Sequence, residues 1–251
     1  NNLDYMIASH YHEDHIGCTP EILSNREVNT AAFDRGDTPK TDAFSNTCYQ
    51  LYVAAVQDKR HTADIDTTIE LDNGQVWISF LAVNGNTIAA ADENDLSVVA
   101  VLHYGRFDLE LGGDLSGENS GGYKDIETSV APKVGRLEVH KIHHHGSQYS
   151  TNQNWLTIVQ PKVGIISVGN GNSYGHPTGD CVDRLHDAAV DLFWTEKGAG
   201  AEPVPELDQV WGTIVVDVTQ GGTSFTVTGS GGTKSYESWP DQAVAEPEFT
   251  N

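Results

Sequence analysis

Basic residues are scarce in this sequence. Lys and Arg number 14 against 36 Asp and Glu in 251 residues, which gives a formal net charge of -22 at pH 7. Tight nucleic-acid binding usually depends on Lys and Arg that neutralise backbone phosphates, so the composition argues against an extended nucleic-acid-binding surface. Nucleic acid stays possible as a substrate, because bound divalent cations would dominate the field at a catalytic site.

Cysteine and long apolar runs are scarce as well. Cys18, Cys48 and Cys181 match no C-x-x-C zinc pattern. A disulfide between Cys18 and Cys48 and free thiols both stay open, because disulfide formation depends on a distance that the sequence does not give. No apolar run is long enough for a membrane span, and no signal peptide is present. The many Asn, Thr, Ser and Gly residues favour a secreted, extracellular protein.

The length and apolar content indicate one substantial folded unit. The chain has 251 residues, of which 38% are hydrophobic, and this supports a single α/β domain with a real core. We predict that this domain covers residues 1–229. Residues 230–251 are polar and carry Gly and Pro, so they are expected to form a loosely held C-terminal tail.

The most informative stretch follows an apolar run at residues 3–8, which reads as a buried strand. His10 and His12 are two positions apart, so in extended backbone they project to the same side and can hold one ion together. Asp14 and His15 fall where the chain turns into a helix and can hold a second ion. Imidazole with carboxylate suits zinc, or manganese and iron where oxygen ligands are numerous. A solvated, histidine-rich loop explains H-x-H-x-D-H directly behind a strand less well.

Three later motifs also follow predicted strands. They are Gly112-Gly113-Asp114-Leu115, His144-His145-Gly146-Ser147 and Tyr174-Gly175-His176-Pro177-Thr178. With the first motif they resemble the metallo-β-lactamase superfamily, whose members are mostly two-metal hydrolases with an αββα sandwich. The succession is similar to the hydrolase domain of ComEC-type competence proteins and their secreted relatives, with phosphorylcholine esterases nearby. The resemblance covers residues 3–229.

The resemblance also implies something about the start of the fold. In the superfamily, several strands of one sheet normally precede the H-x-H-x-D-H motif, whereas here a single predicted strand does. We therefore expect the first N-terminal strands of the fold to be lacking from this sequence. A separate N-terminal fragment that completes the sheet is one expected partner, and the alternative is an exposed sheet edge.

By the same resemblance, Asp114 bridges two metal ions, because its two carboxylate oxygens can contact both. His10 and His12 belong to the first ion, and His176 joins Asp14, His15 and Asp114 at the second. One of His144 and His145 would complete the first ion's ligands, while the other would bond a phosphoryl oxygen or protonate the leaving group. The candidate metal ligands are His10, His12, Asp14, His15, Asp114, His145 and His176, and the candidate catalytic residues are Asp14, Asp114 and His144.

Four residues are candidates for substrate binding: Ser147, Asn172, Tyr174 and Arg35. An ordinary salt bridge to Asp34 or Asp37 is the alternative role for Arg35. Asn172 lies in a Gly-rich loop, where Asn commonly bonds the backbone. The backbone amides near Ser150-Thr151, read as a helix cap, would assist Ser147 in binding an anion.

The remaining pattern predicts alternating strands and helices. Helices are expected from Thr19, over residues 47–60, from a cap at Ser150-Thr151 into Trp155-Leu156, and after Thr178. Asn73-Gly74 predicts a hairpin over residues 69–80, and a second hairpin is expected over residues 96–111. Further strands are expected at residues 137–142, 162–169, 190–195, 212–218 and 224–228.

These inferences predict a binuclear metal-dependent hydrolase, most plausibly a phosphodiesterase, with two divalent ions that are zinc or else manganese or iron. A hydroxide that bridges the ions would attack in line, while the metals neutralise charge on the attacking and leaving oxygens. The resemblance suggests DNA strands or choline-phosphate groups on polymers as substrates, and the acidic surface favours a small or polymer-attached phosphoester. The alternatives are a lactonase or β-lactamase on the same fold and a non-catalytic binding module.

Overall fold

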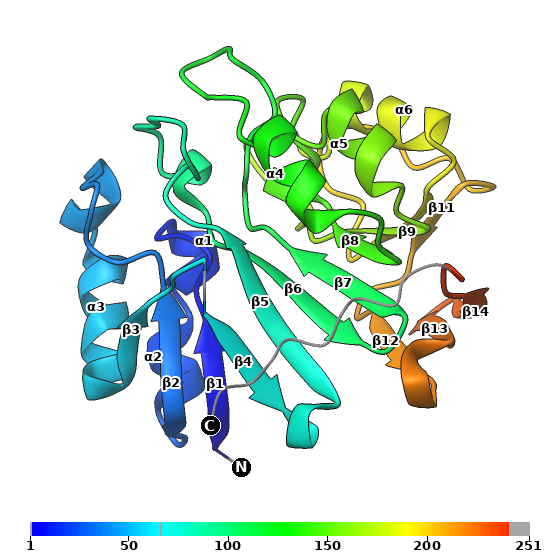
Figure 1. Ribbon diagram of the computed structural model, residues 1–251. Coiled ribbons are helices and arrows are strands. Elements are labelled where there is room, and N and C mark those ends of the chain that lie inside the picture. The colour runs from blue at the N-terminus through cyan, green and yellow to red at the C-terminus, as the bar shows by residue number, and fades with distance from the viewer. Residues whose placement is uncertain (1, 66, 241–251) are drawn as a thin grey trace.

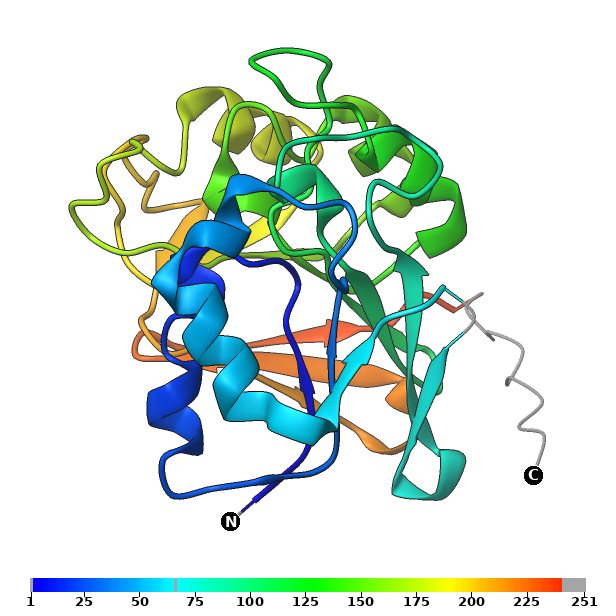
Figure 2. The same cartoon turned by 90° about the vertical axis from the view of Figure 1, so that its left-hand side faces the viewer.

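The computed structural model describes residues 2–65 and 67–240, and its strands in this part form three sheets (Figure 1). The first sheet has three parallel strands in the order β1-β2-β3, and helices α2 and α3 lie over it (Figure 2). A core cluster that includes Tyr11, Ala32 and Tyr52 joins these helices to the sheet. The elements are β1 (Leu3–Ile7), α1 (Glu13–Ile16), α2 (Thr19–Leu23), β2 (Val28–Asp34), α3 (Thr47–Val56) and β3 (Arg60–Thr62).

The largest sheet has eight strands in the order β11-β10-β9-β8-β7-β6-β5-β4. The strands from β4 to β7 are antiparallel, and the strands from β7 to β11 run parallel. They are β4 (Thr68–Leu71), β5 (Val76–Ala82), β6 (Val99–Tyr104), β7 (Phe107–Leu111), β8 (Val139–Lys141), β9 (Val163–Ile166), β10 (Asp191–Trp194) and β11 (Asp208–Val210).

The third sheet is antiparallel, and its strands are the last ones along the described part of the chain. It contains β12 (Val215–Val218), β13 (Ser224–Gly229) and β14 (Gly232–Glu237). The other helices are α4 (Glu127–Val134), α5 (Gln153–Val159) and α6 (Gly179–Asp187), which lie together at one face of the large sheet (Figure 1). Short 3-10 turns are η1 (Asp42–Ser45), η2 (Gln57–Lys59), η3 (Asp72–Gly74), η4 (Asn94–Leu96), η5 (His143–Gly146) and η6 (Gln220–Gly222).

Side-chain alternation along the strands explains the layering. On β10, Leu192 and Trp194 belong to the core beneath α4, α5 and α6, whereas Phe193 belongs to the core shared with Phe225 of β13. Phe80 of the large sheet packs in turn with residues of β1 and β2. The order of layers is therefore helices, the two three-stranded sheets, the eight-stranded sheet and helices, which confirms the predicted αββα sandwich.

Several local predictions differ from the structure. The helix expected over residues 47–60 ends at Val56, because Gln57 adopts a positive φ of 50°. The strand β2 was not predicted. The expectation of a loose tail is wrong for Gly232–Glu237, which pair with β13 as β14, while residues 241–251 lie outside the described part. None of the helices in the described ranges has the length and apolar character needed to cross a bilayer.

The strand directions bring the predicted motifs together. Because β7, β8 and β9 are parallel neighbours, the loops that follow them leave the same edge of the large sheet. The loop after β1 reaches this edge too, since the carbonyl of Ser9 accepts a hydrogen bond from the Val98 N–H at 2.8 Å. The site is therefore built at one edge of a rigid sheet.

Candidate metal centre and active site

The histidine-rich segment changes conformation between His12 and Glu13. His12 is in extended backbone, with φ -67° and ψ 151°, and α1 starts at the next residue. His10 and His12 therefore both precede α1, whereas Asp14 and His15 lie on it, as the sequence predicted. The two halves of the motif consequently face different parts of one site.

Four predicted ligands converge from three segments of the chain. The ligand-type atoms of Asp14, His15, Asp114 and His145 all lie within 4.8 Å of one another. Oδ2 of Asp114 lies 3.2 Å from Nε2 of His15 and 3.4 Å from Nε2 of His145. Nε2 of His145 lies 3.1 Å from Oδ2 of Asp14. Two imidazoles and two carboxylates are a donor set that suits a divalent transition metal. We call these four residues the open cluster, because the clefts described below reach them.

His10 and His12 form a second group beside the open cluster. Nε2 of His10 lies 3.2 Å from Nδ1 of His12 and 3.9 Å from Oδ2 of Asp114. Oδ1 of Asp114 is buried and has no hydrogen-bond partner among the described residues. Nζ of Lys141 lies 3.6 Å from this oxygen, and Oδ2 of Asp114 faces both His10 and His15, so Asp114 fits a position between two metal ions.

An unusual backbone conformation orients His144 and His145 in the His144-His145-Gly146-Ser147 motif. His144 and His145 both have positive φ, 49° and 53°, so their side chains diverge from the turn η5. Nδ1 of His145 donates to the carbonyl of Ser167 at 2.7 Å, which leaves Nε2 directed at the open cluster. The structure therefore places His145 beside Asp14 and His15, although the sequence reasoning had considered it for the first ion.

His176 lies outside the open cluster. Its ring is 5.4 Å from that of His144 and 6.4 Å from that of His145, measured between centroids. Asn172 fixes the loop, because its side chain accepts from the His176 N–H and donates to the His176 carbonyl at 3.0 and 2.9 Å. His145 thus stands where the sequence reasoning placed His176, and Asn172 serves the backbone.

His144 borders the site without joining the open cluster. The side-chain amide of Asn94 donates to its Nε2 at 3.4 Å, which leaves the proton on Nδ1. Nδ1 is buried and has no partner among the described residues. This nitrogen is a hydrogen-bond donor that a bound substrate could use.

The electrostatics of the open cluster reflect its mixture of acids and imidazoles. Burial raises the pKa of Asp114, but contacts with His145 and His15 outweigh burial and hold its pKa well below the usual range. Burial lowers the pKa of His145, yet Asp114 and Asp14 raise it to about 9. Burial and then His15 lower the pKa of His10 well below the usual value. A metal that binds His145 would displace a proton, as is usual for histidine ligands.

The predicted role of Arg35 in substrate binding is wrong. Arg35 is fully buried, and its Nη2 and Nε donate to Glu93 at 2.6 and 2.8 Å. Glu93 in turn accepts from the backbone N–H of Tyr11 at 2.8 Å, so the ion pair supports the histidine-rich loop from behind. A guanidinium paired in this way cannot reach a substrate.

Two clefts meet at the open cluster, and Asp14, His145, Tyr174 and His176 line both. One, of about 540 Å³, holds Ser147 and His144 together with residues that the sequence reasoning missed. The other, of about 670 Å³, is more apolar and extends towards Val168 and Thr195. The missed lining residues are Asn46, Asp92, Asn94, Tyr123 and Tyr149, which no histidine or glycine motif marked.

The other two predicted substrate contacts lie at these clefts. Ser147 is buried in the smaller cleft, and its hydroxyl accepts from the Tyr149 N–H at 3.3 Å. Tyr174 is 81% exposed and stacks on His176 with centroids 6.1 Å apart. Both positions are compatible with contact to a substrate.

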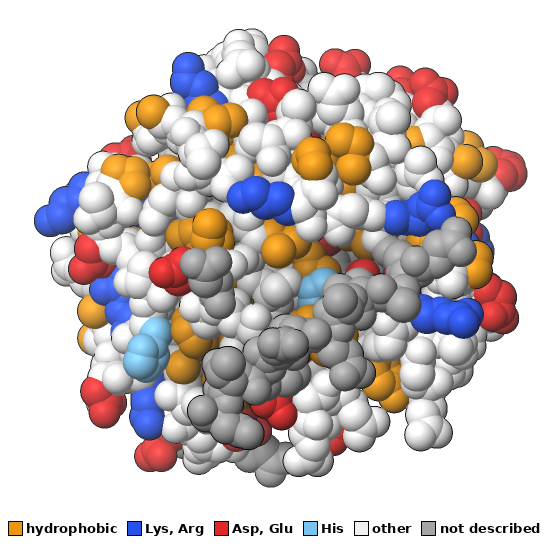
Figure 3. Space-filling model, viewed as in Figure 1, with side chains coloured by type: hydrophobic (Ala, Val, Ile, Leu, Met, Phe, Trp, Pro, Cys, Tyr) orange, Lys and Arg blue, Asp and Glu red, His pale blue; other side chains and the backbone are white. Residues whose placement is uncertain are grey.

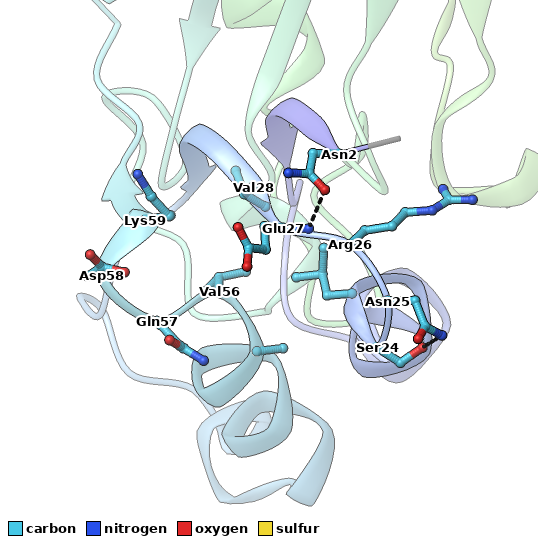
Figure 4. Close-up of a pocket in the computed structure, with 12 residues that line it drawn as sticks. Asn2, Ser24, Asn25, Arg26, Glu27, Val28, Val56, Gln57, Asp58 and Lys59 are labelled. Carbon is cyan, nitrogen blue, oxygen red and sulfur yellow. Dashed lines mark hydrogen bonds between the residues drawn. The ribbon is translucent and has the colours of Figure 1, made fainter.

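A larger groove of about 700 Å³ lies between the end of α2 and the end of α3 (Figure 4). Asn2, whose Oδ1 accepts from the Glu27 N–H at 3.3 Å, borders it with Asp58 and Lys59 (Figure 4). No histidine or cysteine is among its lining residues. This groove therefore lacks the imidazole and thiolate donors of a zinc site.

The surface supports the expectation from composition. On the face in Figure 3, the described Lys and Arg side chains are scattered among acidic, apolar and uncharged groups rather than gathered in one patch. Such a face offers no concentrated positive field for a nucleic-acid backbone.

A profile described as the metallo-beta-lactamase superfamily matches residues 1–170. The chain belongs to the metallo-β-lactamase superfamily. Its relatives include ComE operon protein 3 of Bacillus subtilis (strain 168), 27% identical over 197 residues that cover 78% of this chain and 24% of the relative. Competence protein ComA of Neisseria gonorrhoeae is 31% identical over 107 residues, which cover 42% of this chain and 15% of the relative. The predicted similarity to ComEC-type competence proteins is confirmed, and the chain spans 24% or less of these relatives' length.

Similar solved structures include Zn(2+)-bound PqqB from Methylobacterium extorquens, with a TM-score of 0.46 and 10% identity over 80% of this chain and 72% of that chain. The metallo-beta-lactamase fold protein YhfI from Bacillus subtilis has a TM-score of 0.36 and 14% identity over 76% of this chain and 63% of that one. Membership of this superfamily of metal-dependent hydrolases supports hydrolase activity, and the superfamily binds divalent metals, often two.

Proposed function

We propose that this protein is a binuclear phosphodiesterase. The observation that carries the proposal is the junction of two clefts at the open cluster. A diester has a substituent on each side of its phosphorus, so one substituent can occupy each cleft while the phosphoryl group lies at Asp114. A monoester would leave one cleft unused.

The residues present fit two divalent ions. His10, His12 and Asp114 would hold one, and Asp14, His15, Asp114 and His145 the other, with zinc favoured by the imidazole content. Such ions, when bound, lower the pKa of water and neutralise the charge that develops on phosphoryl oxygens.

The protein's own groups supply orientation. His144 presents Nδ1 without a partner among the described residues, so it can donate a hydrogen bond to a phosphoryl oxygen. Ser147 lies in the same cleft and offers a hydroxyl. The exposed ring of Tyr174 offers a stacking surface for the substituent in the other cleft.

The substrate that this arrangement favours is a small or polymer-attached phosphodiester. Scattered Lys and Arg and a net charge of -22 provide little attraction for long polyanions away from the metals. Single-stranded DNA ends and choline-phosphate groups on polymers are the candidates, and an extracellular location is part of the proposal. A separate N-terminal fragment that pairs with the small sheet is also part of it.

The test compares four substrates on the purified chain, stripped with chelator and then given zinc or manganese. We expect turnover of bis-p-nitrophenyl phosphate, at least about tenfold less of p-nitrophenyl phosphate, and none of nitrocefin or an acyl-homoserine lactone. Turnover of either carbonyl substrate without turnover of the diester would reject the proposal in favour of the alternative hydrolase. No turnover of any substrate by metal-loaded protein would favour a binding module.

A further inference from the structure

A second group of histidine and glutamate residues lies inside the protein. Glu110, His140 and His143 have ligand-type atoms that all lie within 4.8 Å of one another, and each residue is fully buried. Glu127, also fully buried, contacts His143 from the other side. We call these four residues the closed cluster. The proposed reaction uses none of them.

The sheet register creates the closed cluster. Glu110 of β7 pairs directly with His140 of β8, so their side chains lie on the same face, and Oε2 of Glu110 is 2.6 Å from Nδ1 of His140. His143 follows at the end of β8 and brings Nε2 to 3.1 Å from Oε1 of Glu110. Three donors of the types that zinc prefers therefore meet at one point.

The ring nitrogens of His143 and His140 that face away from Glu110 also have polar partners. Nδ1 of His143 lies 2.7 Å from Oε1 of Glu127, and Nε2 of His140 lies 3.5 Å from Oγ1 of Thr151. Glu127 itself accepts from the backbone N–H groups of Thr151 and Asn152 at 2.5 and 2.7 Å. Histidine that binds a metal through one nitrogen usually donates its other N–H to a carboxylate or hydroxyl in this way.

Charge also favours a cation in the closed cluster. Glu110 and Glu127 are two fully buried carboxylates, and within the described residues no Lys or Arg forms an ion pair with either of them. Their compensation must come from protons on the histidines or from a bound ion, because isolated buried carboxylates are very costly. One divalent ion balances both carboxylates while the two imidazoles stay neutral.

The backbone at Gly112 closes the site. A Cβ at this position would lie 2.3 Å from Oε1 of Glu110 and 2.3 Å from Nε2 of His143, so only glycine fits over these atoms. The residues of the closed cluster are fully buried, so an ion held there would serve the fold and not a substrate.

We propose that Glu110, His140 and His143 form a buried structural zinc site, with Glu127 anchoring His143, separate from the catalytic metals. The site would bind zinc during folding, because its residues are fully buried in the folded protein. A third ion per chain is the consequence, in addition to the two of the open cluster.

The test separates the two clusters. In the full chain, Asp14→Ala with Asp114→Ala removes both carboxylates of the open cluster. After expression with zinc and dialysis against EDTA, elemental analysis should still find one zinc ion per chain. Adding His140→Gln or Glu110→Gln should abolish this zinc, whereas the matched control His61→Gln, an exposed histidine of β3, should leave it in place.

X-ray absorption at the zinc edge provides a second readout, with two imidazole nitrogens and carboxylate oxygen expected as ligands. If His140→Gln fails to fold, the spectrum of the parent variant still decides the proposal. A folded parent variant without zinc would overturn it, and so would zinc that survives both substitutions. Neither result depends on phosphodiesterase activity, so failure here is distinct from failure of the proposed function.

Discussion

The open and closed clusters use the same residue types but differ in how their polar atoms are satisfied. In the closed cluster every ring nitrogen and carboxylate oxygen has a protein partner. At the open cluster and its border, Oδ1 of Asp114 and Nδ1 of His144 accept or donate no hydrogen bond among the described residues, although Nζ of Lys141 lies 3.6 Å from Oδ1 of Asp114. The same residue types therefore form a fully enclosed group in one place and a group that faces two clefts in the other, so access to solvent, and not histidine content, distinguishes them.

The largest expected effect is on phosphodiester turnover and comes from removing the Asp114 carboxylate, which lies between the His10–His12 pair and the other residues of the open cluster. Asp114→Ala should reduce phosphodiester turnover by more than about 100-fold, the upper range for loss of a residue that only supports a ligand. Steady-state kinetics and elemental analysis would measure it. The matched control is Asp217→Ala, an exposed aspartate of β12. Unchanged turnover in Asp114→Ala would show that the open cluster is not catalytic.

Substitutions in the closed cluster are expected to lower the free energy of unfolding of the protein. Glu127→Ala leaves His143 and the backbone amides of Thr151 and Asn152 without their acceptor. Removing one partner of a buried ionic group costs about 3–5 kcal/mol, and urea unfolding would measure the loss. Glu206→Ala, an exposed site, is the control. A loss below about 1 kcal/mol would contradict the buried network.

A smaller effect is expected at Asp95, in η4 next to Asn94. Burial raises the pKa of Asp95 from 3.8 to about 6. The folded state therefore keeps a proton that the unfolded state releases, so this residue's contribution to stability is present below pH 3.8 and is lost as pH rises through about 6.

Asp95→Asn removes the charge and should stabilise the protein by about 1–2 kcal/mol above pH 7, with the difference shrinking towards pH 4. Unfolding in urea at several pH values would measure this, with Asp217→Asn as the exposed control. A pH-independent difference would contradict the assignment. The result would sharpen the comparison, because Oδ1 of Asp95 has no hydrogen-bond partner among the described residues, unlike the carboxylate oxygens of the closed cluster.

The smallest effect on turnover is expected at Tyr174, which lines both clefts. Tyr174→Ala should raise KM for the diester about 2- to 10-fold with little change in kcat, because one aromatic contact contributes about 0.5–1.5 kcal/mol. Tyr174→Phe keeps the ring and should behave like the wild type. Since Tyr174 is 81% exposed, the thermal midpoint should not move. An unchanged KM would place the substrate outside this cleft.

The sequence predicted most strands and the ligand motifs because these depend on short-range patterns, whereas the layered αββα fold was implied by the resemblance that the motifs carry. Strand alternation, the Asn73-Gly74 turn and the motifs at strand ends are local features, and the structure contains all of them. The β2 strand was missed because Asn29 and Thr30 interrupt its apolar pattern and are exposed. β14 was missed because its residues are mostly polar or glycine, and it is defined by its pairing with β13.

The site assignments that changed depend on long-range geometry. Arg35 pairs with Glu93, which lies 58 positions away and could not be chosen over neighbouring Asp34 and Asp37 from sequence. His145 rather than His176 joins the open cluster because two consecutive residues adopt positive φ, which histidine seldom does. The closed cluster arises from the pairing of β7 with β8, so His140 read as an ordinary strand histidine.

The short segment from Glu110 to Asp114 supplies one residue to each cluster. Gly112 fits against Glu110, and Gly113, with φ 59°, fits against Ser9. Deleting or inserting a single residue between Glu110 and Asp114 would turn one of these carboxylates away from its partners. In a library of deletions and insertions across the chain, this interval should therefore yield no functional members, although the mostly exposed loop at residues 118–122 on the same connection should accept many.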